Sequence, residues 1–230
     1  MRRLLIAGVV VLVALLLADR VTEVLAANAV AAQLRDSGGL REKPTVSIRG
    51  FPFLTQALSG RYDKVELSAK GVERGSVRLS TLDVVVRGAQ VPLARALSGR
   101  VDSVPVESLT AESLVAFADL AQESQLAEAT IASAGKLVDV TARLSALGGE
   151  FTVTSRSRVT LDMGAILLTP QSVTVEGGSN SAVESALRDR LALRLPVGTL
   201  PYGLRLTGLR VTKDGIVLTA RSGATVLQRP

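Results

Sequence analysis

The N-terminal part of the chain combines an apolar stretch with a helical pattern. Residues 4–18 are all uncharged and apolar or small, and charged residues flank them on both sides. Over 19–36 the apolar positions recur with a spacing near 3.6 and no Gly or Pro interrupts them, which predicts an amphipathic helix. Gly38 and Gly39 are suited to end this helix in a left-handed turn.

Beyond residue 44 the period of the pattern changes to two. In 138–146, for example, apolar residues alternate with Asp, Thr, Arg and Ser. This alternation predicts antiparallel strands with one buried face and one polar face. The Asp214-Gly215 pair separates two further strands, at 203–212 and 216–221, and Asp-Gly is a strong signal for a hairpin turn.

Helical patterns interrupt these strands in four places, at 51–58, 92–98, 111–132 and 180–193. Strands and helices together predict a single α+β domain over 19–230, with the helix at 19–36 and the sheet with its helices over 44–222. The predicted architecture is a long, twisted antiparallel sheet that carries the helices on its apolar face.

Two stretches of the chain resemble each other, 51–65 and 91–104. Each reads apolar-Pro-apolar, then a short helix, then Leu-Ser-Gly-Arg and an Asp two residues before a Val. Two copies are too few for a solenoid. The similarity indicates either a helix-to-strand unit that is used twice or a shared way of ending a helix.

The composition excludes several kinds of chemistry. The 230 residues include no Cys, His or Trp, which excludes disulfides, thiolate nucleophiles, the Ser-His-Asp triad and the usual zinc sites. Aromatic residues make up 3% of the chain, too few for the stacking platforms of a single-strand nucleic-acid binder. Ser133 and Lys136 have S-x-x-K spacing, but the companion S-D-N and K-T-G elements are absent. We therefore predict no catalytic residue, no metal and no cofactor.

Residues 1–18 have the character of a targeting segment. Two arginines and an apolar run match the first two parts of a secretory signal. The segment is either a cleaved signal peptide or an uncleaved signal-anchor, whose fifteen apolar residues fall short of the roughly 17–25 that a span needs unless the flanking arginines snorkel. In both cases the positive-inside rule places residues after about 18 outside the cytoplasm. We expect the chain in the cell envelope, on the periplasmic side of the cytoplasmic membrane, anchored or released.

The apolar excess of the chain has two interpretations. Hydrophobic residues make up 47% of the sequence and the mean hydropathy is +0.34. They form either a dry core or an internal apolar groove, in which burial of an acyl chain yields about 0.8 kcal/mol per CH₂. The cations that give the net charge of +6 are scattered along the strands. They are either a solvated sheet face or contacts for anionic lipid headgroups.

Three stretches together resemble a known family. They are IRGFPFLTQALSGRYDKVELSAKGV at 48–72, VPLARALSGRVDSVPVESLTA at 91–111 and LPVGTLPYGLRLTGLRVTKDGIVLTARS at 195–222. With the N-terminal apolar segment, they resemble the LmeA-type family of actinobacterial cell-envelope phospholipid-binding proteins, over about 19–225. The resemblance implies a tubular lipid-binding (BPI-like) fold, in which a strongly twisted sheet encloses an apolar cavity. It also implies phospholipid or phosphoinositide binding, a role in envelope lipid and lipoglycan upkeep, and no enzymatic activity.

The motif positions that match the family are 50–54, 60–63 and 201–203. No agreed catalytic set belongs to them. We expect the cavity lining to come from large apolar residues, many of them beside Gly and Pro bends, namely Phe51, Phe53, Leu54, Leu58, Tyr62, Val84, Val86, Leu97, Phe117 and Tyr202. The expected headgroup contacts are Arg49, Arg61 and Arg100.

The favoured hypothesis is therefore a non-enzymatic phospholipid-binding protein of the bacterial envelope that sequesters acyl chains in an apolar groove. Its partners would be phospholipids, with anionic headgroups favoured, and the inner membrane. The main alternative is a structural or adaptor domain with a dry core that binds an envelope protein. A third hypothesis, a hydrolase or transferase that uses carboxylates, requires acidic side chains to converge in space, whereas most of them lie on polar strand faces or in turns.

Overall fold

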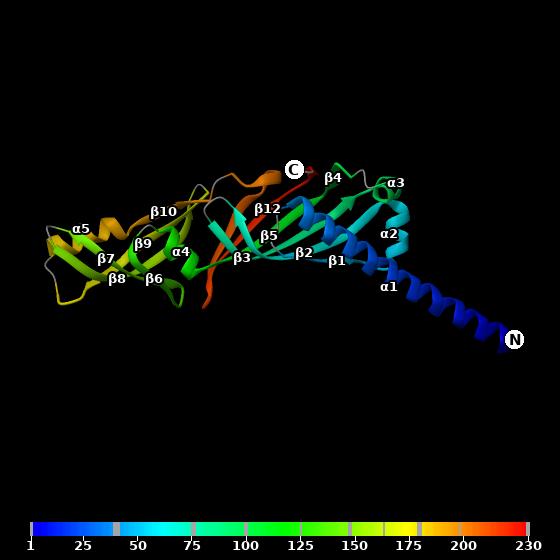
Figure 1. Cartoon of the computed structure of the whole chain (residues 1–230), viewed down its shortest axis with the longest axis horizontal. Helices are drawn as coiled ribbons and strands as arrows, with labels where there is room; N and C mark the ends of the chain where they lie inside the picture. Colours follow the sequence, from blue (N-terminus) through cyan, green and yellow to red (C-terminus); the bar gives the residue numbers. More distant parts are fainter. Residues whose placement is uncertain are drawn as a thin grey trace. The chain divides into compact units, whose positions relative to one another are not determined.

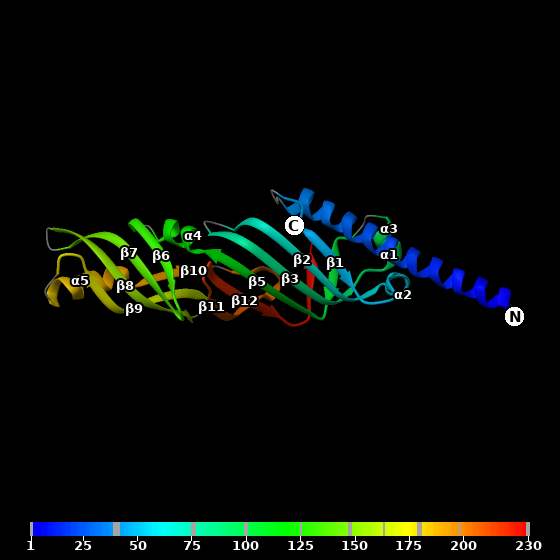
Figure 2. The same cartoon turned by 90° about the horizontal axis from the view of Figure 1, so that it is seen from below.

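The computed structural model describes residues 2–38, 42–74, 77–98, 101–124, 126–146, 149–162, 164–178, 181–197 and 199–228. The fold is α+β, with curled antiparallel sheets and helices (Figures 1 and 2). The chain divides into two compact units. The first unit contains residues 1–70, 83–110 and 222–230, and the second unit contains residues 71–82 and 111–221.

The N-terminal helix of the first unit is longer than the pattern predicts. Helix α1, Arg2–Gly38, includes both the apolar run and the amphipathic segment. No proline interrupts the sequence between them, so nothing in the backbone chemistry ends the helix at Asp19. In the second half of α1, Ala27 and Ala31 are buried. In the described part of the chain, no helix meets the combined length and hydropathy of a bilayer crossing.

A six-stranded sheet has the order β1-β2-β3-β5-β12-β11. In the first unit β1 pairs antiparallel with β2, with Ile48 opposite Val65, and β4 pairs with β13. The bounds of these strands and of the two short helices are β1 Thr45–Arg49, α2 Phe53–Ser59, β2 Arg61–Arg74, β3 Val77–Gln90, α3 Leu93–Leu97, β4 Ser103–Val106, β5 Ser108–Ala116, β11 Arg205–Val211, β12 Gly215–Ser222 and β13 Thr225–Gln228.

The second unit is built on a five-stranded antiparallel sheet with the order β10-β9-β8-β7-β6. Its elements are α4 Phe117–Glu123, β6 Ala127–Ala134, β7 Leu137–Ala146, β8 Gly149–Asp162, β9 Ala165–Val175, α5 Ser181–Leu191, β10 Leu193–Pro196 and the short η1 turn Pro201–Gly203. The alternation predicted for 138–146 is confirmed, since Val138, Val140 and Ala142 are buried. They pack in one apolar cluster with Leu187 and Leu191 of α5.

Other local predictions are confirmed with shifted bounds. The predicted helices at 51–58, 92–98 and 180–193 appear as α2, α3 and α5. The predicted hairpin also forms, because β11 and β12 pair antiparallel. At its turn the Thr212 N–H donates to the Gly215 carbonyl oxygen (2.8 Å).

The prediction of one helix over 111–132 is wrong. The segment contains the end of β5, the seven-residue helix α4 and the start of β6. Val115 lies in the core, 1% exposed, on a strand that pairs within the six-stranded sheet. The close approach of β5 and β12 depends on Gly215, where a Cβ would stand 2.1 Å from the Val115 carbonyl oxygen. Sheet pairing of this segment therefore outweighs the helical spacing of its apolar residues.

Candidate functional site

The motif at 50–54 begins a helix whose cap comes from far away in the sequence. Pro52 stands at the N-cap of α2 and supplies no side-chain hydrogen bond. Asp19 of α1 takes that role: the Phe53 N–H donates to Oδ2 (3.1 Å) and the Leu54 N–H to Oδ1 (2.8 Å). Asp19 is 3% exposed. Its carboxylate satisfies two of the unpaired N–H groups at the start of the helix and so fixes α2 to α1.

The two copies of the internal repeat meet at the end of α2. Gly60 ends α2 with φ 69°, a left-handed conformation, and a Cβ there would stand 3.0 Å from Pro92 Cα. The Val91 N–H donates to the Gly60 carbonyl oxygen (2.8 Å). The glycine shared by both copies therefore has a packing role in the first, where it lets the second copy approach.

A small apolar cluster lies between the motif at 50–54 and helix α1. Phe53, 3% exposed, packs with Ile48, Ala57 and Ala27 of α1. The Phe53 and Tyr62 rings are 6.2 Å apart between centroids. Burial raises the pKa of the Tyr62 phenol above its usual value. This cluster holds the motif against α1.

Two large apolar side chains of the same region point to solvent. Phe51 is 58% exposed and Leu58 is 76% exposed. The Arg20 guanidinium carbon lies 5.5 Å from the centroid of the Phe51 ring, in cation–π geometry. Leu58 follows the buried Ala57 on α2, so the helix has one face in the cluster and another in solvent, and Phe51 lies two residues before the buried Phe53.

The second unit has an open hollow of about 470 Å³ between α4 and β6. The lining residues are mostly small or aliphatic: Ala118, Ala121, Gln122, Leu126, Ala129, Thr130 and Ile131. The volume is within the roughly 300–1,000 Å³ range of small-molecule sites. Small alanine side chains leave this space open, and Gln122 and Thr130 give it a polar contribution.

The expected lining residues occupy different environments. Phe53 and Phe117 are buried, Phe51 and Leu58 are exposed, and the side chain of Leu97 lies outside the described residues. The remaining five are partly buried: Leu54, Tyr62, Val84, Val86 and Tyr202. Phe117 belongs to α4, next to the hollow's Ala118, but its side chain packs in the core of the second unit. The structure brings Phe51, Phe53, Leu54, Leu58 and Tyr62 together around α2.

Two of the three expected headgroup residues already have carboxylate partners. Arg49 Nε lies 2.8 Å from Glu66 Oε2, and Arg61 pairs with Glu107. Lys64 and Arg49 hydrogen-bond to Glu66 and lower the pKa of that carboxyl. Arg100 lies outside the described residues. A lipid phosphate at Arg49 or Arg61 would have to compete with the existing carboxylate.

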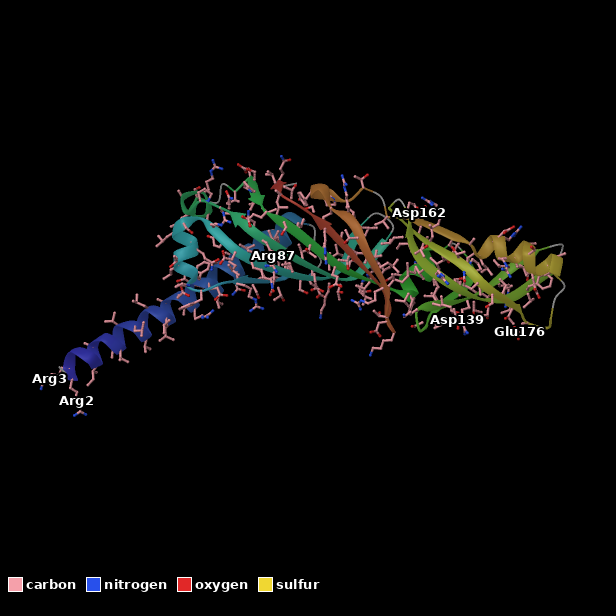
Figure 3. All side chains as sticks on the ribbon, turned by 180° about the vertical axis from the view of Figure 1, so that it is seen from behind. Arg2, Arg3, Arg87, Asp139, Asp162 and Glu176 are labelled. Atoms are coloured by element: carbon pink, nitrogen blue, oxygen red, sulfur yellow. The ribbon has the colours of Figure 1, made fainter. Side chains whose placement is uncertain are left out.

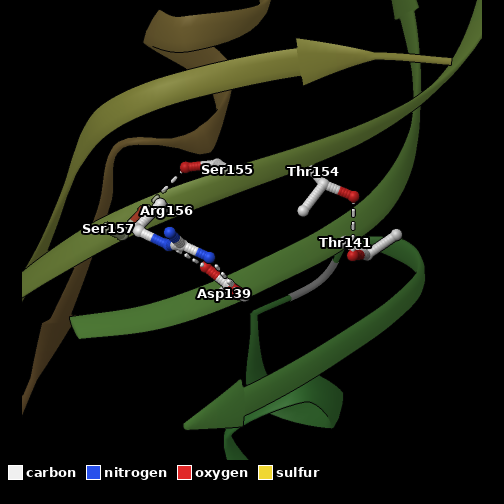
Figure 4. Close-up of polar contacts among 6 residues, drawn as sticks. All are labelled: Asp139, Thr141, Thr154, Ser155, Arg156 and Ser157. Carbon is white, nitrogen blue, oxygen red and sulfur yellow. Dashed lines mark hydrogen bonds and ion pairs between the residues drawn. The ribbon is translucent and has the colours of Figure 1, made fainter. Parts of the chain in front are cut away.

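The polar face of the second unit's sheet carries its own pairs (Figures 3 and 4). Arg156 of β8 binds Asp139 of β7 through two hydrogen bonds, of 2.9 and 3.0 Å. The Arg156 hydrogen bonds lower the pKa of the Asp139 carboxyl, and the same bonds raise the pKa of Arg156. On the opposite face, Ser155 and Ser157 are buried and hydrogen-bonded to each other (2.7 Å).

Sequence patterns missed two features of these sites. Asp19 had no local signal beyond its place at the end of the apolar run, because its partners are 34 and 35 positions away. The hollow was hidden by the incorrect helix at 111–132, although its residues lie within that segment. Within the described residues, no three acidic side chains come close enough to hold a metal ion.

Comparisons with known proteins give one match. A search of curated proteins and a search of solved structures each found no similar protein. The sequence model described as LmeA-like phospholipid-binding matches residues 17–221, most of the chain. This agrees with the resemblance carried by the motifs at 48–72, 91–111 and 195–222, and the chain belongs to the LmeA-like phospholipid-binding family.

Proposed function

We propose that this chain is a non-enzymatic envelope protein that takes the acyl chains of phospholipids into the α4–β6 hollow. The lipid-binding role comes from its family, and the hollow of about 470 Å³ is the observation that carries the choice of place. A C16 chain gains about 0.8 kcal/mol for each CH₂ removed from water. A hollow that takes up part of an acyl chain can therefore retain a lipid without any catalytic group, and such a protein would contribute to the upkeep of envelope lipids and lipoglycans.

The same proposal includes a membrane anchor at the N-terminus. The apolar side chains of residues 6–17 are mostly exposed on α1, and Figure 3 places Arg2 and Arg3 at the far end of this helix. Fifteen residues give a helix length of about 22 Å, against a hydrocarbon thickness of about 30 Å. Snorkelling of Arg2, Arg3 and Arg20 would cover part of the difference. The orientation follows from the two arginines, which stay in the cytoplasm.

The test uses the full chain in vesicles that contain a phosphatidylglycerol with a photoreactive group at the end of one acyl chain. After illumination, mass spectrometry of the peptides locates the cross-links. We expect cross-links within 117–134, in addition to those in 2–18 from the anchor. Ala118→Trp should remove the cross-links within 117–134, because the indole would occupy the hollow that Ala118 lines. Ala118 is exposed, so the position can accept a larger side chain.

The matched control is Ala182→Trp, an exposed position on α5 of the same unit that does not line the hollow. It should keep the cross-links within 117–134. Cross-links confined to 2–18 in the unaltered chain would contradict sequestration in the hollow. That result would favour the adaptor hypothesis, in which the apolar faces of the second unit form a dry core and a protein partner is bound.

A further inference from the structure

The internal repeat places two short helices at the point where α1 leaves the first unit. Asp19 holds the start of α2 to α1 through the Phe53 and Leu54 N–H groups. The bond from the Val91 N–H to the Gly60 carbonyl oxygen then holds the second copy, with α3, beside the first. Both views of the fold show α2 beside α1, and Figure 1 shows α3 next to α2, farther from α1 (Figures 1 and 2). They form what we call the α2–α3 end of the first unit, residues 50–62 and 88–98.

The α2–α3 end carries charges of both signs. Asp63 and Asp102, which follow the two short helices in the two copies of the repeat, are exposed. Three further acidic groups are engaged: Asp19 caps α2, Glu23 pairs with Arg20 (2.9 Å) and Glu107 pairs with Arg61. Arg95 on α3 is exposed, and it is the cation of this end that we consider for contact with a lipid phosphate.

The same end carries exposed apolar side chains. Phe51, two residues before α2, and Leu58, on α2, are 58% and 76% exposed, whereas Phe53 and Ala57 of the same helix are buried. Arg20 stacks on the Phe51 ring (5.5 Å). A large ring with a cation against it, near the start of α2, and an exposed leucine in its last turn are side chains suited to the headgroup region of a bilayer.

The position along α1 relates this end to the bilayer. The apolar run ends at Ala18, and the next residue, Asp19, contacts the first turn of α2 directly. A helix that carries residues 4–18 in the hydrocarbon must have residue 19 at the boundary with water. The backbone of Phe53 and Leu54, hydrogen-bonded to Asp19, then lies at the same depth.

We infer that the α2–α3 end is a second membrane-contact surface, in which Phe51 and Leu58 insert among the headgroups of an anionic bilayer and Arg95 contacts its phosphates. This inference rests on the anchoring of the chain through residues 4–18 proposed above. It does not depend on the hollow of the second unit. It gives the repeat a function, because the second copy supplies α3, which carries Arg95, beside α2 of the first copy.

The absence of tryptophan from the sequence allows a direct test with single-tryptophan variants. The full chain with Leu58→Trp is reconstituted in phosphatidylglycerol vesicles, with and without lipids brominated at the upper part of the acyl chain. We expect the emission of this tryptophan to shift to shorter wavelength and to be quenched by the brominated lipids. Leu58 is exposed enough for the larger side chain to leave the fold intact.

Two further variants separate the possible failures. Val226→Trp is the matched control, an apolar position of the first unit on β13 that is 45% exposed, and it should stay unquenched. Val10→Trp, within the apolar run, reports the anchor. Quenching at position 10 without quenching at position 58 would overturn the inference and leave the anchor standing. If the tryptophan is quenched neither at position 10 nor at position 58, the anchor itself is refuted and the inference with it.

The contribution of charge has its own measurement. Arg95→Glu, in the Leu58→Trp background, should lower the ratio of docked to undocked protein at least about fivefold in phosphatidylglycerol vesicles. Arg87→Glu is the control, because Arg87 is an exposed arginine on β3 of the same unit.

Discussion

Asp19 offers the most direct test of how the first unit is held together. Its carboxylate accepts two backbone N–H groups, at 3.1 Å from Phe53 and 2.8 Å from Leu54, and the residue is 3% exposed. Asp19→Ala removes both acceptors and leaves buried donors at the start of α2 without partners. A hydrogen bond to a charged group contributes about 1.5–3 kcal/mol. Part of the stability lost with the two hydrogen bonds is recovered, because the variant no longer has to desolvate a buried carboxylate.

We therefore expect Asp19→Ala to lower the free energy of opening of α2 by about 3 kcal/mol, which is roughly a 100-fold change in the opening equilibrium. The assay is hydrogen exchange of the full chain in a mild detergent, followed by mass spectrometry. Amides in 50–62 should exchange faster by that factor. Amides of the β7–β8 pair belong to the second unit and serve as an internal reference whose rate stays the same.

Two variants sharpen this prediction. Asp19→Asn keeps one acceptor oxygen and should accelerate exchange about half as much on a logarithmic scale. Asp36→Ala removes an exposed carboxylate near the end of the same helix, which pairs with the neighbouring Arg35, and should have no effect on 50–62. Exchange of 50–62 that is the same in Asp19→Ala as in the unaltered chain would refute the reasoning that α2 depends on this cap.

Three further predictions concern stability. Gly215→Ala should lower the melting temperature strongly, because its Cβ would stand 2.1 Å from the Val115 oxygen, whereas Gly223→Ala meets no atom within 4 Å and should be neutral. Phe53→Ala should cost about 3–5 kcal/mol, and Leu58→Ala about 0.5 kcal/mol or less, in urea unfolding. The pKa of Asp139 is lowered by Arg156, so the pair adds stability above the usual carboxyl pKa and loses it as the pH falls through the folded-state pKa. Asp139→Asn should remove this decrease in stability at acid pH, and an NMR titration of the Asp139 carboxyl in the unaltered chain checks that its pKa is lowered. Equal melting temperatures for both glycine variants, equal urea midpoints for both apolar variants, or an unaltered acid slope would each contradict its prediction.

Periodicity predicts well the elements whose burial is decided by their own residues. β7 alternates between a core face with Val138 and Val140 and a polar face with Asp139, and the sequence shows this alternation directly. The β11–β12 hairpin is likewise marked by Asp214 and Gly215. In both cases the local signal and the tertiary environment agree, so a pattern read along the chain is sufficient.

Prediction fails where a distant residue decides the structure. The segment 111–132 has apolar residues at helical spacing, but Val115 pairs and packs within sheets built from residues far along the chain. The same reason hides the role of Asp19 and the carboxylate partners of Arg49 and Arg61, which lie 17 and 46 positions away. The expected lining residues around α2 cluster as a group, but their exposed members face solvent, which a list of apolar residues has no means of indicating.

The continuity of α1 has a mechanical consequence. A domain on a flexible linker samples many orientations, whereas here the last turn of the apolar run and the first turn that packs on the first unit belong to the same helix. At that point the Asp19 carboxylate joins α1 to the start of α2 with hydrogen bonds. With residues 4–18 anchored in a bilayer as we propose, the first unit would have no flexible joint to the anchor and would change its orientation together with α1. Because the apolar run is shorter than the hydrocarbon thickness, local thinning of the bilayer would bring the first unit closer to the membrane.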